Sequence, residues 1–228
     1  VTICSYGEAA QRPKFHCTSE TVPGSNMHAF FTWNSTRYDI TIRDIEIEAP
    51  LASSCIRLMN GANVEGMKII NCKLHGSTWG LRLLYTANVL VDNVEIYDTA
   101  DDGMFVQGVS DLEIKNSYVH NVNTNWQPPS TPESEAAGDG IQLDKCNGWH
   151  VHHNFIDRTS SGNKFCFISN NPDQTDGVLE HNYMIGPLVD GCTVYLHDGD
   201  GIIVRYNLMK GPSSRPLYSP NSVNSSSL

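Results

Sequence analysis

The sequence predicts an all-β fold, a right-handed parallel β-helix of about seven coils. An asparagine recurs between two short β-rich stretches, at Asn71, Asn93, Asn116, Asn154, Asn182 and Asn207. The spacings are 22, 23, 38, 28 and 25 residues, and Asp44 takes the same place 27 residues before the first asparagine. Units of this kind, with two or three short strands and no helical periodicity, stack as a solenoid with coils about 4.8 Å apart. We expect the asparagines to turn inward at one corner as a ladder of amides, each bonded to the next coil.

A second predicted strand precedes each corner asparagine, and apolar residues alternate with other residues along it. These strands are expected at 55–59, 80–84, 103–107, 140–144, 165–169 and 193–197, with a looser match from residue 29. Their second and fourth residues are Ile56/Leu58, Leu81/Leu83, Met104/Val106, Ile141/Leu143, Cys166/Ile168 and Val194/Leu196. Because side chains alternate along a strand, these residues point into the core and the others point outward. Leucine-rich repeats need a leucine consensus that is absent here, and β-propeller blades need about 40 residues each.

Two irregularities interrupt the repeat. In the first coils the inward residue lies two positions before the corner, whereas in the last three it lies three positions before it, at Val151, Leu179 and Val204. An extra residue, such as a β-bulge, is therefore expected just before the corner in those coils. The 38-residue interval contains a polar, proline-rich stretch at 121–138, which predicts a loop inserted beside the binding face.

Composition and charge argue against several classes of protein. Of the 228 residues, 39% are hydrophobic and 18% are charged, and the net charge is −10. The negative charge argues against a nucleic-acid partner, and no apolar run approaches the roughly 20 residues that cross a bilayer. The seven cysteines include no C-x-x-C pair, so free thiols are expected rather than a zinc knuckle. The chain begins without Met or a signal peptide, and we expect a single β-helix domain over 1–228 that is part of a longer chain.

Stacking the coils brings charged residues into one column. Asp102, Asp139 and Lys164 each come directly before a predicted strand, on three successive coils about 5 Å apart. Asp101 lies beside the first of them. Aspartate before glycine is also common in turns, and lysine beside aspartate also forms ordinary surface ion pairs, so each residue alone has an explanation without a function. Their convergence with the outward side chains of the same strands favours a reaction centre.

The outward positions of these strands carry arginine, aromatic and polar side chains. The third positions are Arg57, Arg82, Phe105, Gln142, Phe167 and Tyr195, and the fifth positions include Asp144 and His197. Arginines bind carboxylates and phosphates through paired hydrogen bonds, and exposed aromatic rings offer flat faces to sugars. The sequence therefore predicts a groove for an acidic polysaccharide, with the binding residues Arg57, Phe105, Gln142, Asp144, Phe167, Tyr195 and His197.

The repeat, the asparagine ladder and glycine-initiated strands such as "GDGIQL" resemble one known group of proteins. This group is the pectate-lyase-like superfamily of right-handed parallel β-helices, and the resemblance covers residues 29 to about 211. The superfamily includes polysaccharide lyases, polygalacturonases, uronan epimerases and phage tailspike depolymerases. The resemblance implies the fold and a polysaccharide partner, but it does not choose the reaction, because one fold hosts many activities.

The leading hypothesis is a polysaccharide lyase that cleaves a uronate-containing acidic glycan by β-elimination. In such lyases a lysine or arginine removes the proton next to the uronate carboxylate, and an arginine or calcium neutralises that carboxylate. Transferred by residue type, the resemblance implies Lys164 as the base and Arg82 or Arg57 as the neutralising residue. It also implies calcium as a candidate cofactor, with the ligands Asp101, Asp102 and Asp139.

Two other functions remain open. In galacturonases, aspartates on neighbouring coils act as acid and base, and the same three aspartates offer this role to a glycoside hydrolase. The Gly-His-Gly and Arg-Ile-Lys stretches of that family are missing here. The third hypothesis is a non-catalytic glycan-binding or structural module of a phage tail or adhesin. These hypotheses place the chain outside the cell or on a virion, and a tailspike would be a homotrimer.

Overall fold

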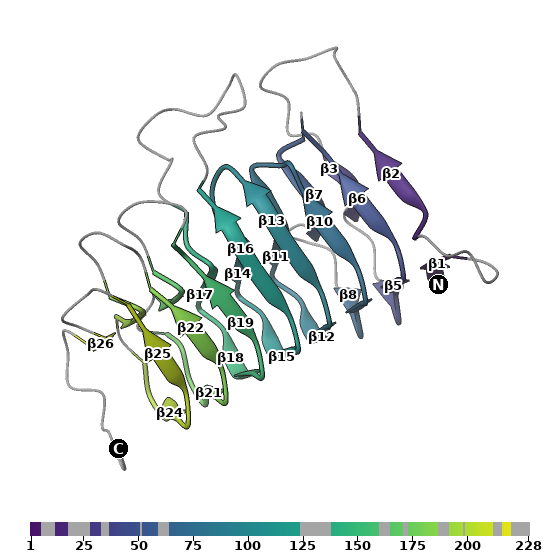
Figure 1. The fold of residues 1–228 in the computed structure, drawn as a ribbon. Coiled ribbons are helices and arrows are strands. Elements are labelled where there is room, and N and C mark those ends of the chain that lie inside the picture. The colour runs from purple at the N-terminus through teal and green to yellow at the C-terminus, as the bar shows by residue number, and fades with distance from the viewer. Residues whose placement is uncertain are drawn as a thin grey trace.

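The structure, a computed structural model, is a stack of short parallel strands. It describes residues 1–5, 12–17, 28–32, 37–50, 52–58, 64–123, 138–159, 165–170, 173–186, 192–197, 199–211 and 216–219. Lys164 and most of the predicted loop at 121–138 lie outside these residues. Throughout the described ranges the regular elements are strands, and their coils stack along one axis from the N-terminal to the C-terminal end (Figure 1). The predicted parallel β-helix is confirmed.

Three parallel sheets form the walls of the solenoid. Sheet A contains, in order, β1 (Thr2–Cys4), β5 (Thr41–Arg43), β9 (Lys68–Ile70), β12 (Ala87–Asp92), β15 (Ser110–Lys115), β18 (Asn147–His152), β21 (Val178–Glu180) and β24 (Ile203–Arg205), with β4 (Arg37–Tyr38) and β8 (Val64–Glu65) beside this path. Sheet B contains β2 (Lys14–His16), β6 (Glu46–Glu48), β10 (Lys73–His75), β13 (Glu95–Thr99), β16 (Tyr118–Val122), β19 (Phe155–Asp157), β22 (Tyr183–Ile185) and β25 (Leu208–Lys210). Sheet C contains β3 (His28–Thr32), β7 (Ser54–Leu58), β11 (Trp79–Leu84), β14 (Met104–Gln107), β17 (Ile141–Asp144), β20 (Phe167–Ser169), β23 (Val194–Leu196) and β26 (Leu217–Tyr218).

Each coil visits the sheets in the order A, B and C. In one coil, β12 of sheet A is followed by Asn93, whose φ is 55°, and then by β13 of sheet B. Asparagine adopts this left-handed conformation more readily than most residues, so it makes the sharp corner between the two sheets. The chain then enters β14 of sheet C and returns to sheet A at β15, one coil further along the axis.

The interior is filled by columns of apolar side chains, one or two from each strand. In sheet C the buried pairs are those expected from alternation, Ile56/Leu58, Leu81/Leu83, Met104/Val106, Ile141/Leu143 and Val194/Leu196. The columns from sheets A and B are Ile42, Ile69, Val91, Ile114, Val151 and Leu179, and Ile47, Leu74, Ile96, Val119, Ile156 and Met184. Burying such a side chain contributes about 1.5–3 kcal/mol. Since each column packs across coils, every coil depends on its neighbours for stability.

Glycine is required where sheet C begins in the central coils. A Cβ atom on Gly103 would lie 2.5 Å from Val119 Cγ1 and 2.7 Å from the Gly140 carbonyl oxygen. On Gly140 it would lie 2.6 Å from Ile156 Cγ2. Because these distances are shorter than any normal contact, the strands of sheets B and C approach this closely only with glycine at both positions. As a result, Asp102 and Asp139, which directly precede these glycines, lie just before the strands of sheet C.

The asparagine ladder differs from its prediction in the first coils. Asn71, Asn93 and Asn116 occupy the left-handed corner position itself, with φ of 52°, 55° and 52°. Their side chains stay on the outside, where Asn93 Nδ2 donates to Asn71 Oδ1 over 3.0 Å. The expectation that these three asparagines turn inward is wrong, because a residue in the left-handed position projects its side chain away from the core here.

In the later coils the asparagine lies one position further along and does turn inward. His153 and His181 take the left-handed position, with φ of 54° and 53°, and the buried Asn154 and Asn182 follow them. The backbone N–H and the Nδ2 of Asn154 each donate to Asn182 Oδ1 over 3.0 Å. The inward amide ladder is therefore confirmed for these coils.

The β-bulge predicted before the later corners is wrong. Ile114 pairs with Val151, and Lys115 pairs with His152, so the strands β15 and β18 run in register up to the corner. The residue count between strand and corner is therefore the same in both coils. The asparagine occupies the corner position in the earlier coils and the position after it in the later coils. Counting from the asparagine therefore suggests an extra residue that the strands do not contain.

The cysteines are thiols, as the sequence predicts. No disulfide joins any two of the seven, and five of them are buried. Burial raises the pKa of the Cys55 and Cys146 thiols to about 12, so both are poor nucleophiles. No helix in the described part of the chain is long and apolar enough to cross a bilayer.

Candidate functional site

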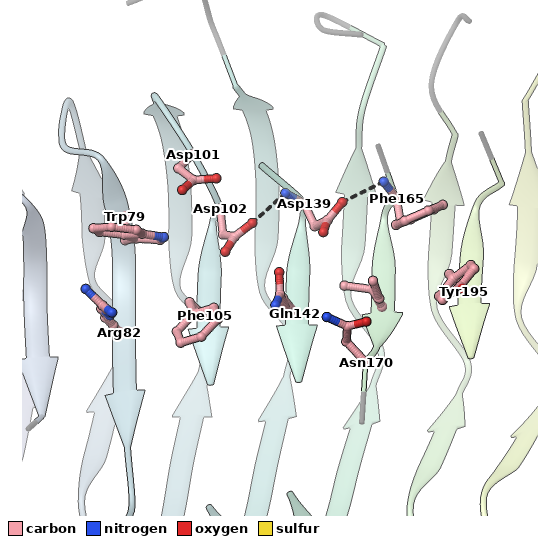
Figure 2. Close-up of a pocket in the computed structure, with 11 residues that line it drawn as sticks. Trp79, Arg82, Asp101, Asp102, Phe105, Asp139, Gln142, Phe165, Asn170 and Tyr195 are labelled. Carbon is pink, nitrogen blue, oxygen red and sulfur yellow. Dashed lines mark hydrogen bonds between the residues drawn. The ribbon is translucent and has the colours of Figure 1, made fainter. Parts of the chain in front are cut away.

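A groove of about 670 Å³ runs across the outer face of sheet C. The strands β11, β14, β17, β20 and β23 and the residues just before them supply its walls. Its lining, most of which Figure 2 labels, is Trp79, Arg82, Asp101, Asp102, Phe105, Asp139, Gln142, Phe165, Ile168, Asn170 and Tyr195. The structure therefore brings the three predicted aspartates together with an arginine and several aromatic rings.

Two aspartates form a hydrogen-bonded chain along the groove. Asp102 and Asp139 directly precede the glycines that start sheet C, and each is only 4% exposed. The backbone N–H of Asp139 donates to Asp102 Oδ1 over 2.6 Å, and the backbone N–H of Phe165 donates to Asp139 Oδ1 over 2.8 Å. Figure 2 shows both bonds, with the two carboxyl groups next to each other on adjacent coils. Each carboxyl group is thus tied to the backbone of the following coil.

The environment of Asp102 favours its protonated form. Burial raises the pKa of the Asp102 carboxyl well above its usual range, and the charges of Asp101 and Asp139 raise it further. The amide of Asp139 and the charge of Arg158 act in the opposite direction. Asp102 therefore keeps its proton to a higher pH than an ordinary aspartate, which is the property of a general acid.

Arg82 lies at one end of the groove between two aromatic rings. Its guanidinium carbon is 4.4 Å from the centroid of the Trp79 ring and 5.4 Å from that of Phe105. These ring contacts restrict the orientation of the guanidinium, and they keep a positive charge in the groove. Arg57 is the strand neighbour of Arg82 on the preceding coil, but it is only 7% exposed and does not line the groove.

The other end of the groove is less charged and also contains two aromatic rings. Phe105, Gln142, Ile168 and Tyr195 occupy equivalent positions on successive strands. The Tyr195 ring stacks on the Phe165 ring with centroids 4.9 Å apart. The predicted binding residues Phe105, Gln142 and Tyr195 are therefore in the groove.

Asp144 and His197 lie on the same strands outside the groove lining. Gln142 Nε2 donates to Asp144 Oδ1 over 3.3 Å, and burial raises the pKa of the Asp144 carboxyl. The ring of His197 lies 6.0 Å from that of Tyr195. Asp144 thus holds the side chain of Gln142, and a direct contact of Asp144 or His197 with substrate stays a prediction.

Phe167 is not an exposed binding residue. Ile141 pairs with Phe167 and Gln142 pairs with Ile168, so this strand is shifted by one residue from the predicted alignment. Phe167 is 0% exposed and packs against Trp149, with ring centroids 5.4 Å apart. The prediction failed because the stretch "FCFIS" is apolar at four successive positions, so alternation does not define which side faces inward. The shift also places Phe165, rather than Lys164, next to Asp139.

One residue of the site gave no signal in the sequence. Arg158 follows β19 and is 0% exposed. Its Nη1 donates to the Val122 carbonyl and its Nη2 to the Gly138 carbonyl, both over 2.6 Å. Sequence reasoning gives no reason to bury an arginine that follows a short strand, because its partners lie 20 and 36 residues away. The groove-lining Trp79, Phe165 and Asn170 were missed as well, and the prediction that Ile168 points into the core is wrong, because it pairs with Gln142 and lines the groove.

Calcium remains untested by the structure. Among the described residues, no group of three or more histidine, cysteine, aspartate or glutamate side chains is arranged to hold a metal ion. The carboxylates of Asp101, Asp102 and Asp139 are ligands of the type that calcium prefers. Asp102 and Asp139 each already use one oxygen for a backbone N–H. Calcium binding stays a prediction, and the function proposed below does not depend on it.

The family of the chain follows from a comparison of its sequence with protein-family models. The model for the right handed beta helix region matches residues 34–211, which is more than half of the chain. The chain belongs to the right-handed β-helix family. This agrees with the three stacked sheets, and it assigns no reaction. No curated protein sequence matches this chain.

Several solved structures have a similar fold. The enzymatically active domain of bacteriophage CBA120 tailspike protein 2 is 9% identical with a TM-score of 0.48, covering 88% of this chain and 38% of that one. DFA-IIIase from Arthrobacter chlorophenolicus A6 is 13% identical with a TM-score of 0.45, covering 78% and 44%. Alginate lyase from Paenibacillus sp. str. FPU-7 is 12% identical with a TM-score of 0.36, covering 81% and 90%. The chain thus spans less than half of the first two, and the likeness concerns the fold alone.

Proposed function

We propose that this chain cleaves a polysaccharide lying in the groove of sheet C, by glycoside hydrolysis with Asp102 as the general acid. The observation that carries this proposal is a buried carboxyl group with a raised pKa, next to two further carboxyl groups in an open groove. Pairs of carboxyl groups whose environments separate their protonation states are the usual machinery of glycoside hydrolases. The aromatic rings along the groove supply flat faces for sugar rings.

The reaction divides two proton transfers between the carboxyl groups. Asp102 gives its proton to the glycosidic oxygen as the bond from that oxygen to the anomeric carbon breaks. Water adds to the anomeric carbon, and its proton goes to one of the neighbouring carboxylates, Asp101 or Asp139. The base then releases this proton to solvent and Asp102 takes one up, so that both groups return to their starting protonation states. Separate Asp101→Asn and Asp139→Asn variants identify the base, because only loss of the base removes the step that activates water.

The substrate proposed for this groove is an acidic polysaccharide. Arg82 presents a guanidinium that is held between two rings at one end of the groove. A carboxylate or sulfate on a sugar would be attracted to this positive charge in the groove, since arginine binds such groups in proteins. Beyond Gln142, the rings of Phe165 and Tyr195 would bind sugar faces without requiring charge.

A second candidate is β-elimination on a uronate, and Arg82 favours it. In a lyase this guanidinium would neutralise the uronate carboxylate and so make the neighbouring proton easier to remove. The base would be Lys164, which precedes the groove-lining Phe165 in the chain and lies outside the described residues. The elimination breaks the bond to the leaving sugar and forms a carbon–carbon double bond, whereas hydrolysis consumes water and forms none.

One experiment separates the candidates. The protein is incubated with a panel of acidic and neutral glycans, with calcium or with EDTA, while new reducing ends and ultraviolet absorbance are recorded. Reducing ends without absorbance support hydrolysis, absorbance supports elimination, and binding with neither supports a non-catalytic module. An Asp102→Asn variant should lose hydrolysis, whereas Asp111→Asn, the same change at an exposed residue of β15 in sheet A, should not. Full activity of the Asp102 variant would overturn the assignment of the acid.

Location and assembly are proposals that depend on this function. An enzyme that degrades a polymer meets its substrate outside the cell, so we propose an extracellular or virion-associated chain. A homotrimer would fit a tailspike. Light scattering on the purified protein measures the mass, and a monomer under all conditions would contradict the trimer.

A further inference from the structure

Arg158 connects the chain on both sides of residues 124–137. Its two terminal nitrogens donate to the Val122 carbonyl, at the end of β16, and to the Gly138 carbonyl, directly before Asp139. Both distances are 2.6 Å, and the side chain is 0% exposed. One guanidinium thus links the end of sheet B to the segment that carries a groove aspartate.

Gly138 transmits this contact to a second aspartate. A Cβ atom on Gly138 would lie 2.1 Å from the carbonyl carbon of Asp101, so the two backbones are in close contact. Asp139 follows Gly138, and its N–H makes the 2.6 Å bond to Asp102. Movement of Gly138 would therefore displace the amide that binds Asp102 and release the backbone packing of Asp101.

The charges around Arg158 explain why a cation is buried here. The Nε of Arg158 has no hydrogen-bond partner within the described residues, so the two carbonyls leave the guanidinium incompletely satisfied. Isolating a charge from water is costly unless opposite charges compensate it. Burial lowers the pKa of the Arg158 guanidinium, and the charges of Asp139, Asp102 and Asp101 act in the opposite direction.

We propose that Arg158 is the positioning residue of the acid pair, holding Gly138 so that the Asp139 amide stays bonded to Asp102. This inference rests on the proposed function for its catalytic consequence, but its structural part does not. Arg158 is not one of the residues that line the groove of about 670 Å³, so its effect on the aspartates is indirect. It acts through Gly138 and through its charge beneath the three aspartates.

The test compares Arg158→Met and Arg158→Lys with Arg205→Met. The control removes an exposed arginine that pairs with Glu180 on sheet A. A displaced catalytic group lowers turnover by about 100-fold, so kcat of the Met variant should fall by about that factor while KM stays within about threefold. Lysine keeps the charge but lacks the planar fork, so its kcat should be intermediate. A positioning role would be contradicted if the two Arg158 variants had equally raised KM values and an unchanged kcat.

Amide exchange tests the positioning without any substrate. In the wild-type protein the Asp139 N–H is protected by its bond to Asp102, and in the folded Met variant its exchange should accelerate by about tenfold or more, while the amides of β12 and β15 do not change. Unchanged protection of Asp139 in either folded variant overturns the proposal, even if activity is never found. If the Met variant does not fold, the Lys variant gives the same readout. Loss of Asp139 protection in a protein inactive on every glycan would instead show that the proposed function failed.

Discussion

Replacing Asp102 with asparagine should stabilise the fold while it removes the proposed activity. Burial and the charges of Asp101 and Asp139 raise the pKa of the Asp102 carboxyl. The folded chain therefore holds this proton more tightly than the unfolded chain. For a carboxyl group of this kind, the contribution to stability is fully present below the unfolded pKa and is lost as the pH rises toward the folded pKa. Asparagine is neutral at every pH and keeps an oxygen for the Asp139 N–H, which now donates over 2.6 Å.

The size of the effect follows from the burial of the carboxyl group. Asp102 is 4% exposed and makes one hydrogen bond to the backbone, so its charge is poorly compensated. A buried polar group in this situation costs about 1–3 kcal/mol. The free energy of unfolding of Asp102→Asn should exceed that of the wild type by this amount at about pH 8, and by much less at about pH 5. In a chain of this size, each kcal/mol raises Tm by about 2–4 °C.

Thermal unfolding followed by circular dichroism at the two pH values measures the difference. Asp111→Asn is the matched control, because the same change at an exposed residue should leave Tm nearly unchanged at both pH values. An Asp102→Asn protein less stable than the wild type near the higher pH would refute the reasoning. So would a gain of equal size at both pH values, because a buried titrating carboxyl group requires the gain to depend on pH.

Three further outcomes follow from the packing and charges of the fold. Gly103→Ala should lower the free energy of unfolding by about 1–3 kcal/mol in urea denaturation, because its Cβ would meet Val119 Cγ1 at 2.5 Å; unchanged stability would contradict the close approach of sheets B and C. Asn154→Ala should cost about 1–3 kcal/mol in the same assay, because it leaves the buried Ser117 N–H without its acceptor at 3.0 Å. Arg82→Met should raise KM for an acidic glycan about tenfold and weaken its salt dependence; an unchanged KM would exclude Arg82 from binding.

Local patterns in the sequence were sufficient for the fold. Strict alternation at Leu81/Leu83 and Met104/Val106 sets which side of each strand is inward, and the structure buries those residues. Alternation also placed Phe105 outward and put Asp102 at the start of its strand. These features depend on neighbours two residues apart in the chain, so a single sequence contains them.

Local patterns did not predict the correct alignment of a strand or corner where the sequence allowed two alignments. "FCFIS" is apolar on both sides of the strand, and the alignment that buries Phe167 against Trp149 was the one realised. The corner asparagines resemble one another in sequence, yet Asn93 occupies the left-handed position and Asn154 the position after it. Choosing between such alignments requires the contacts of adjacent coils, which a short stretch of sequence does not contain.

The sequence by itself therefore determined the parallel β-helix and the column of aspartates on neighbouring coils. Only the tertiary structure decided that Asp102 is buried and bonded to the Asp139 amide, and that a buried Arg158 bonds to the Gly138 carbonyl next to Asp139. The physical reason is the range of the interactions. Strand alternation is local, whereas the pKa of Asp102 and the burial of Arg158 depend on charges and carbonyls that stacking brings together from residues 20 to 37 positions apart.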